Sequence, residues 1–200
     1  MPTAAAPQMG TTYANVTVIG ADLGAVVAAL RDATALVTDT IDGMTVVFAE
    51  ADEEASRFGE GVTAAALSGA CECDAIEVSV FDDVILQYRL YRHGAEVDVG
   101  VVATPVAVEL AEMAGGSLPV PDPGRLVDRL GRGNVAVAGR ALSTEEPIER
   151  ASDRHAWLVE ALDLPRCAPG WGYRYLTSFP DGFDGGPLTP VGNAGFQEET

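Results

Sequence analysis

Residues 76–102 read IEVSVFDDVILQYRLYRHGAEVDVGVV and contain three short runs rich in β-branched and aromatic residues. The dipeptides Asp82-Asp83 and His93-Gly94 separate these runs. Runs of this composition that are joined by such short loops are typical of an antiparallel meander. We therefore predict that this stretch forms three neighbouring strands of one sheet.

The middle run of this stretch alternates between apolar and mostly polar side chains. Since successive side chains of a strand point to opposite faces, alternate residues share a face. We predict that one set faces the core and the other is open to solvent. The apolar set is Val84, Leu86, Tyr88 and Leu90.

The sequence before the meander predicts strands and helices in the order β-α-β-β-α-β. This order is typical of a ferredoxin-like sandwich, in which two helices cover one face of an antiparallel sheet. The fold class predicted is therefore α+β, a ferredoxin-like sheet extended by the meander. The strands are expected at 13–19, 35–40 and 44–49, and the helices at about 23–32 and 55–69.

The character of the chain changes after the meander. Thr104-Pro105 predicts the start of a helix, since Thr is a frequent N-cap and Pro suits the first turn. Val106, Leu110 and Met113 line one face of that helix. The Pro-rich segment SLPVPDPG at 117–124 then predicts a stiff connector.

The remaining third of the chain predicts a helical C-terminal extension. A helix is expected from Asp122-Pro123, and another over 145–162; residues 134–138 suit either a short strand or a buried piece of helix. Tyr173 and Tyr175 alternate with Arg174, which predicts a short aromatic strand. The predicted division of the chain is a flexible N-terminus 1–12, a sandwich domain 13–116, an extension 117–179 and a Gly/Pro-rich irregular tail 180–200.

The chain is strongly acidic, with 30 acidic against 12 basic residues and a net charge of −18. This charge disfavours nucleic acid and anionic lipid as partners and suits a basic protein. No run of about 18 apolar residues predicts a membrane span, and the N-terminus has no signal-peptide pattern. Three cysteines without secretory features suggest reduced thiols, so we expect a cytoplasmic protein.

Three aspartates are candidates for a divalent-cation site or an acid/base pair: Asp82, Asp83 and Asp98. The competing interpretation is structural, because aspartate is an ordinary turn residue and the spacing of a calcium loop is absent. The structural interpretation is favoured for Asp82 and Asp83.

Two other patterns are weak. The segment VTVIGADLG lacks the second and third glycines of a dinucleotide fingerprint, so no nucleotide cofactor is predicted. A zinc site could be assembled from cysteines and histidines, but no paired knuckle motif exists, and packing roles are favoured. The residues concerned are Cys71, Cys73, Cys167, His93 and His155.

Arg125, Arg129 and Arg132 lie at i, i+4 and i+7, which places them on one helical face. Their functional interpretation is a contact with phosphate or carboxylate. The favoured interpretation is pairing with the chain's own acids, for example at 145, 146 and 149.

Trp171, Tyr173, Tyr175 and Phe179 form an aromatic cluster between glycines. An exposed cluster would be an interaction hot spot, and a buried one would dock the C-terminal segment. Burial is favoured, and Trp171, Tyr173 and Tyr175 remain interaction candidates.

The segments FDDVILQYRLYRHGAEVD (81–98), RHAWLVEALDLP (154–165) and GYRYL (172–176) together resemble a pattern found in an uncharacterised bacterial protein family. The pattern is an aspartate-rich hairpin, a following strand and a later helix that ends in a Leu-Pro step. The resemblance implies a coherent fold and no particular activity, cofactor or site residue.

Taken together, these patterns favour a protein that acts by binding another protein, as an immunity-type, inhibitory or regulatory partner, without catalysis. The alternative is a small-molecule or divalent-metal-binding domain that uses the aspartates or the arginine face named above. Catalysis is left open but not favoured, and no cofactor is predicted. An edge strand of the meander could also pair across a two-fold axis, which favours a homodimer.

Overall fold

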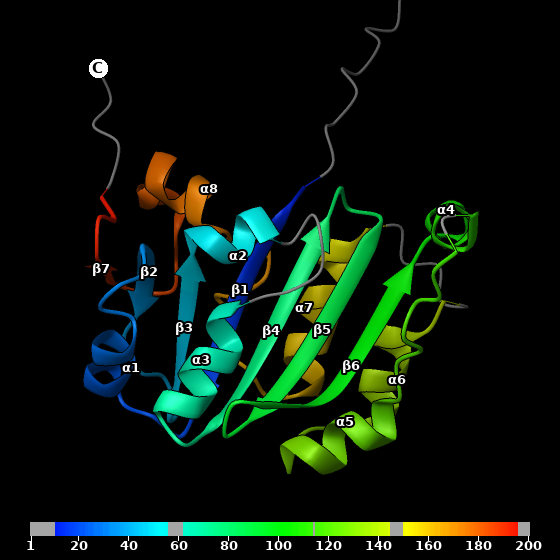
Figure 1. Cartoon of the computed structure of the whole chain (residues 1–200), viewed down its shortest axis with the longest axis horizontal. Helices are drawn as coiled ribbons and strands as arrows, with labels where there is room; N and C mark the ends of the chain where they lie inside the picture. The colour runs from blue at the N-terminus through cyan, green and yellow to red at the C-terminus, as the bar shows by residue number, and fades with distance from the viewer. Residues whose placement is uncertain (1–10, 56–61, 114, 145–149, 196–200) are drawn as a thin grey trace, which may run out of the picture.

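The computed structural model describes residues 11–55, 62–113, 115–144 and 150–195. Its centre is one antiparallel sheet of seven strands in the order β6-β5-β4-β1-β3-β2-β7 (Figure 1). The mixed α+β class with an antiparallel sheet is therefore confirmed. The strands are β1 (Tyr13–Ile19), β2 (Ala35–Thr38), β3 (Met44–Ala49), β4 (Asp74–Phe81), β5 (Ile85–Arg92), β6 (Ala95–Ala103) and β7 (Leu188–Val191).

The predicted meander is present as β4, β5 and β6. Asp82, Asp83, His93 and Gly94 all have positive φ, between 49° and 81°. Such left-handed pairs match the twist of the strands that they join, and Asp and Gly tolerate them. The local turn chemistry thus sets the register of this half of the sheet.

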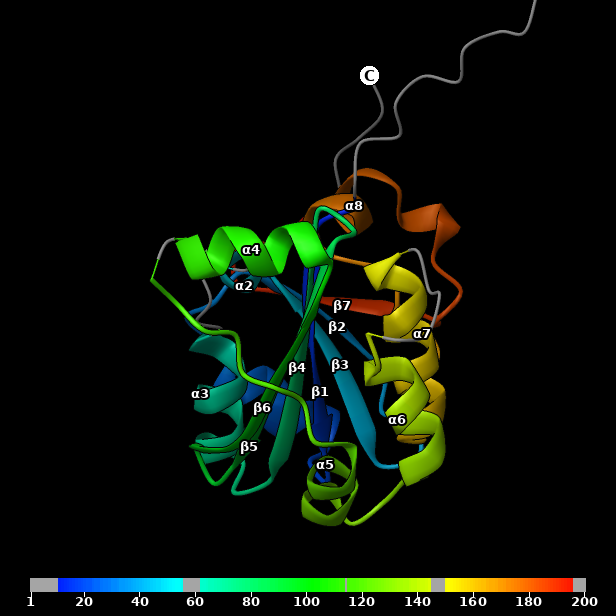
Figure 2. The same cartoon turned by 90° about the vertical axis from the view of Figure 1, so that its right-hand side faces the viewer.

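Helices cover both faces of the sheet, because the helical C-terminal extension forms a second layer opposite the helices that precede the meander (Figure 2). The front layer contains α1 (Leu23–Ala29), α2 (Glu50–Ala55) and α3 (Val62–Ala70). The back layer contains α5 (Pro123–Leu130), α6 (Val135–Leu142) and α7 (Ala151–Ala161). The back layer exists because β1, β4 and β5 carry apolar side chains on that face as well.

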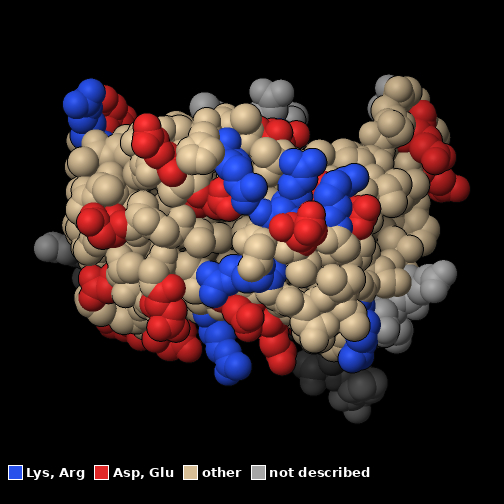
Figure 3. Space-filling model, turned by 90° about the horizontal axis from the view of Figure 1, so that it is seen from below, with Lys and Arg blue, Asp and Glu red and all other residues tan. Residues whose placement is uncertain are grey.

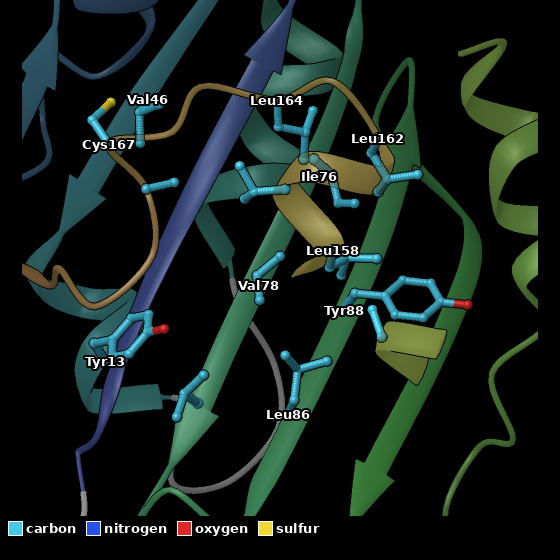
Figure 4. Close-up of a cluster of buried hydrophobic side chains, with 14 of the residues drawn as sticks. Tyr13, Val46, Ile76, Val78, Leu86, Tyr88, Leu158, Leu162, Leu164 and Cys167 are labelled. Carbon is cyan, nitrogen blue, oxygen red and sulfur yellow. The ribbon is translucent and has the colours of Figure 1, made fainter. Parts of the chain in front are cut away.

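Two hydrophobic cores result, one on each face. The front core joins strand residues such as Val16 and Val47 to Val26 of α1 and Leu67 of α3. The back core is larger and joins the other face of the strands to α5, α6 and α7. In Figure 4, Leu158 of α7 and Leu162, the residue that follows this helix, lie against a group of strand side chains that includes Ile76, Val78, Leu86 and Tyr88. Helices α5, α6 and α7 therefore complete the main core.

Of the two alternatives for residues 134–138, the structure has the helix: α6 begins at Val135, and its N-cap Asn134 accepts hydrogen bonds from the backbone N–H groups of Ala136 and Val137. Two other local predictions differ from the structure. The aromatic segment is also a helix, α8 (Tyr173–Ser178), and not a strand. Residues 188–191 are not irregular, since they pair with β2 as β7.

Helix α8 forms at a place where a distant carboxylate caps it. The Glu53 carboxylate accepts a hydrogen bond from the Arg174 backbone N–H in the first turn of α8. A Cβ atom on Gly172 would lie 2.7 Å from the Tyr13 Cβ and 2.8 Å from a Glu53 oxygen, so only glycine fits there. This tertiary cap outweighs the strand pattern of the local sequence.

Helix α4 (Pro105–Met113) follows β6 and lies apart from the other helices, beyond the end of that strand (Figure 1). Within the described part of the chain, no helix is long and apolar enough to span a bilayer.

Candidate functional site

Asp82 and Asp83 form the turn between β4 and β5, and Asp83 stabilises the start of α7. Its carboxylate accepts a hydrogen bond from the Ser152 N–H at 3.1 Å, and its carbonyl accepts one from the Ala151 N–H at 2.9 Å. The N-cap residue of α7, Arg150, supplies no side-chain hydrogen bond to the helix. Asp83 thus replaces the missing cap from a distant part of the sequence.

Asp98 lies away from that turn and is already paired. Its side chain is nearly fully buried, with 4% relative exposure of the residue. It accepts hydrogen bonds from the Tyr88 hydroxyl at 3.2 Å and from Arg125 Nε at 2.6 Å. These contacts satisfy the carboxylate within the fold.

The three candidate aspartates do not converge. In the ladder between β5 and β6, Asp98 lies opposite Leu90. Ile85, which is next to the Asp82-Asp83 turn, lies opposite Ala103, five residues further along β6. Five residues of a strand span about 16 Å. Among the described residues, no group of three His, Cys, Asp or Glu side chains is placed to hold a metal ion. The geometry therefore gives no support to a cation site at these aspartates.

The three candidate arginines do not share one helical face, so that prediction is wrong for Arg132. Helix α5 ends at Leu130, and Gly131 adopts a left-handed conformation with φ of 69°. Arg132 lies beyond this cap, with Nη1 3.0 Å from the Met44 sulfur. Arg129 is exposed on α5, and its carbonyl accepts a hydrogen bond from Arg92.

The arginines near α5 are balanced by acids from the sheet. Arg125 pairs with Asp98, and Arg92 forms a two-pronged ion pair with Asp74 at 2.7 and 2.8 Å. Figure 3 shows basic and acidic side chains interleaved on this underside. Pairing with one of the chain's own acids therefore agrees with the favoured interpretation for Arg125, whose partner is Asp98. The acids at 145, 146 and 149 lie outside the described residues.

The aromatic candidates divide into buried and exposed members. Tyr173 is buried, whereas Tyr175 and Phe179 are more than half exposed. Ring centroids lie 5.2 Å apart for Trp171 and Tyr175, and 5.1 Å apart for Tyr175 and Phe179. Burial, the favoured interpretation, therefore fits Tyr173 but not Tyr175.

The cysteines and histidines lie at separate places. Cys71 and Cys73 follow α3 and are half-buried, Cys167 is buried in the back core, and His93 is exposed in the β5–β6 turn. His155 lies inside the molecule, where its Nδ1 is 2.9 Å from the Tyr13 hydroxyl. Burial lowers the pKa of His155 to about 3, so the ring is neutral. Cys167 and His155 therefore pack inside the fold, whereas His93 is a surface residue of a turn.

Helix α4 contains no buried residue. Val106, Leu110 and Met113 have relative exposures of 65%, 58% and 75%. Their i, i+4, i+7 spacing places them on one face of the helix. We call these three residues the α4 stripe. An apolar stripe at this spacing is ordinarily buried against a neighbour, and nothing in the described part of the chain covers it.

An apolar cavity of about 460 Å³ lies beside the first turns of α4. Its apolar lining includes Val84 of the β4–β5 turn, Val102 of β6 and Val108 of α4. Asp83, Glu109 and Arg154 also line it. The α4 stripe and this cavity are thus neighbouring apolar features at one end of the molecule, because Val108 and Glu109 belong to the same helix as the stripe.

A larger cavity, of about 970 Å³, lies between the β2–β3 loop and the segment after α7. Met44, Val159 and Leu164 contribute apolar walls. Four acidic residues line it as well, and among the described residues none of their carboxylates forms an ion pair. These residues are Asp42, Glu160, Asp163 and Asp184.

Comparison with protein-family models, with curated proteins and with solved structures gives no significant match to this chain.

The sequence contains the α4 stripe, but it does not reveal that the stripe is exposed. A buried helix would show the same spacing of Val106, Leu110 and Met113. A signal does exist in the flanking residues: Gly115-Gly116 and the Pro-rich connector separate this helix from the elements on either face of the sheet. That separation is compatible with an unpartnered helix.

Proposed function

We propose that this chain acts by binding another protein through α4, as an immunity-type, inhibitory or regulatory partner, without catalysis. The α4 stripe is the observation that carries the proposal, since three large apolar side chains on one helical face are more than half exposed. Contiguous exposed apolar surface commonly marks a site of protein interaction.

Burial of the α4 stripe by a partner lowers the free energy of the molecule in water. Removing a Val, Leu or Met side chain from water contributes about 1.5–3 kcal/mol when burial is complete. Three such side chains can form the centre of an interface, where a few apolar anchors contribute most of the binding energy. The neighbouring cavity could accept a further apolar side chain of the partner.

The charge of the chain supports a basic partner. At −18, the molecule attracts positively charged proteins over a range set by salt screening and increases their rate of association. A net charge of this kind affects the association rate and the choice of partner more than the final affinity of the complex. The apolar stripe and the acidic surface would thus have separate roles in binding.

The finer topology is part of the proposal. The order β4-β1-β3-β2, with α1 between β1 and β2 and α3 between β3 and β4, supports a ferredoxin-like unit. The meander then adds β5 and β6 beyond β4, and α4 follows at that end of the sheet. The fold by itself implies no activity.

Replacing the whole α4 stripe tests the function. A variant with Val106→Gln, Leu110→Gln and Met113→Gln keeps residues that favour helix and removes the apolar face. We expect tagged wild-type protein to recover one partner at fixed stoichiometry from its own host, and we expect the variant to lose it. Affinity purification with mass spectrometry, followed by calorimetry on the purified pair, measures this difference.

Val135→Gln is the matched control, since Val135 is also exposed but lies on α6. Circular dichroism and the melting temperature should be nearly unchanged in both variants, because none of the replaced residues is buried. Equal recovery of the partner by wild type and the stripe variant would contradict the proposal.

A second candidate function, small-ligand binding, is favoured by the 970 Å³ cavity. Its four carboxylates outnumber the one base in its lining, Arg166, and together with the apolar walls they suit an organic cation with an apolar body. We expect spermidine, used as a probe, to raise the melting temperature of wild type but not of an Asp163→Asn, Asp184→Asn variant. Glu72→Gln, at an exposed position outside the cavity, is the control. An equal shift in all three proteins would indicate a non-specific charge effect.

A further inference from the structure

The residues around the α4 stripe indicate what kind of partner covers it. We propose that the occupant is a basic amphipathic helix, which lies along α4 with lysine or arginine side chains opposite Glu109 and Glu112. This inference rests on the proposed function and specifies the partner of the same site.

The helical geometry places acids beside the stripe. At about 100° per residue, Val106, Leu110 and Met113 fall within about 60° of one another. Viewed down the helix axis, Glu109 is rotated about 60° from Val106, and Glu112 is rotated further in the same sense. Both glutamates are exposed. One border of the stripe is therefore acidic.

The opposite side of α4 faces the protein. Ala107, Val108 and Ala111 are half-buried, and Val108 lines the cavity described above. A partner can therefore approach from the stripe and from its acidic border. The sequence has no arginine or lysine between Arg92 and Arg125. Arg154 lines the same cavity as Glu109, but it is buried and donates to the Ala141 and Ser143 carbonyls. Local charge thus favours positively charged side chains in the partner.

The stripe suits a helix better than a strand. It extends over about 10 Å, the rise of seven helical residues, and its i, i+4, i+7 anchors match those of helix-to-helix packing. A partner strand would need free backbone groups at the edge of the sheet. Next to α4 that edge is β6, and the Val101 N–H already donates to the Pro119 carbonyl at 2.9 Å.

A second copy of this chain fits poorly. If two α4 helices packed antiparallel about a two-fold axis, the acidic borders would face each other, with Glu109 near Glu109 of the other copy. Neither α4 nor the connector offers a base to offset this repulsion. Two chains of net charge −18 would also repel each other at longer range. The homodimer predicted through a sheet edge is a different contact.

The test uses two synthetic helical peptides that share one leucine face. The first has lysine at the flanking positions and the second has glutamate. We expect wild-type protein to bind the lysine peptide about tenfold more tightly than the glutamate peptide in calorimetry at physiological salt. A Glu109→Lys, Glu112→Lys variant is expected to reverse this preference.

Asp32→Lys, Asp39→Lys is the matched control. It changes the net charge by the same amount at two exposed positions, one before β2 and one directly after its last residue, Thr38. We expect this variant to keep the wild-type preference for the lysine peptide. If its preference changes as much as that of the α4 variant, the overall charge of the molecule is responsible and the inference is wrong.

The remaining outcomes separate this inference from the proposed function. Both peptides could bind wild-type protein equally, and the triple glutamine variant could lose both. In that case α4 is a docking site whose partner need not be basic. This outcome overturns the inference about a basic helix but leaves the proposed function intact. If light scattering shows a wild-type dimer that the triple variant dissociates, a second copy is the occupant. Absence of lysine-peptide binding overturns the inference, and recovery of a host partner still decides the proposed function.

Discussion

Alanine in place of Leu158 is expected to lower the free energy of unfolding of the whole protein by about 3 kcal/mol. Leu158 lies on α7, is fully buried and belongs to the back core, in which α7 contacts β4 and β5 (Figure 4). Truncation of a fully buried leucine removes its transfer free energy and leaves a cavity, at a typical cost of about 2–5 kcal/mol. The surrounding side chains come from rigid strands, so the cavity should close only in part.

Urea unfolding followed by fluorescence and circular dichroism measures this effect. Because α7 shares its core with β4 and β5, we expect both probes to show one transition and the same shift of its midpoint. Glu160→Ala is the control, since Glu160 is exposed on the same helix. Two transitions, of which only one shifts, would show that residues 117–179 fold as a separate unit.

The meander was predictable because its determinants are local. Leu86, Tyr88 and Leu90 alternate with polar residues, and all three are fully buried on one face of β5. The short turns contain residues that tolerate positive φ. Period and turn chemistry together determine which face of a strand meets the core.

The features that sequence reasoning missed depend on distant contacts. Glu53 caps α8 across 121 residues of sequence, and Asp83 caps α7 across 69. Asp98 pairs with Arg125 across 27 residues, so neither residue is available for the role that its spacing suggested. A local pattern specifies what a segment can do, and tertiary contacts decide which of these options is realised.

The α4 stripe shows the same limit at the candidate site. Its spacing resembles that of a core helix such as α5, in which Leu126 and Leu130 are buried. The difference is that α5 packs against the apolar back face of the sheet, whereas α4 extends beyond β6. Amphipathicity indicates that a partner face is needed, but it does not say whether that face belongs to the same chain.

Glutamine in place of Glu77 is expected to stabilise the protein at pH 8 by about 2–3 kcal/mol. Glu77 lies on β4 with 4% relative exposure, and among the described residues its Oε2 has no hydrogen-bond partner. Burial, followed by the charge of Asp52, raises the pKa of Glu77 from 4.5 to about 7, while Arg89 opposes the shift. At pH 8 the folded protein therefore contains a buried, ionised carboxylate.

The pH dependence distinguishes this explanation from a simple packing effect. The folded state binds the Glu77 proton more tightly than the unfolded state, so the wild type loses stability as pH rises from about 4.5 to about 7. Glutamine cannot ionise, so its advantage should be largest at pH 8 and only a few tenths of a kcal/mol at pH 4. Urea unfolding of both proteins at each pH measures it, with Glu160→Gln as an exposed control. A gain that is equal at pH 4 and pH 8 would mean that glutamine improves packing or hydrogen bonding and that ionisation of Glu77 does not destabilise the fold.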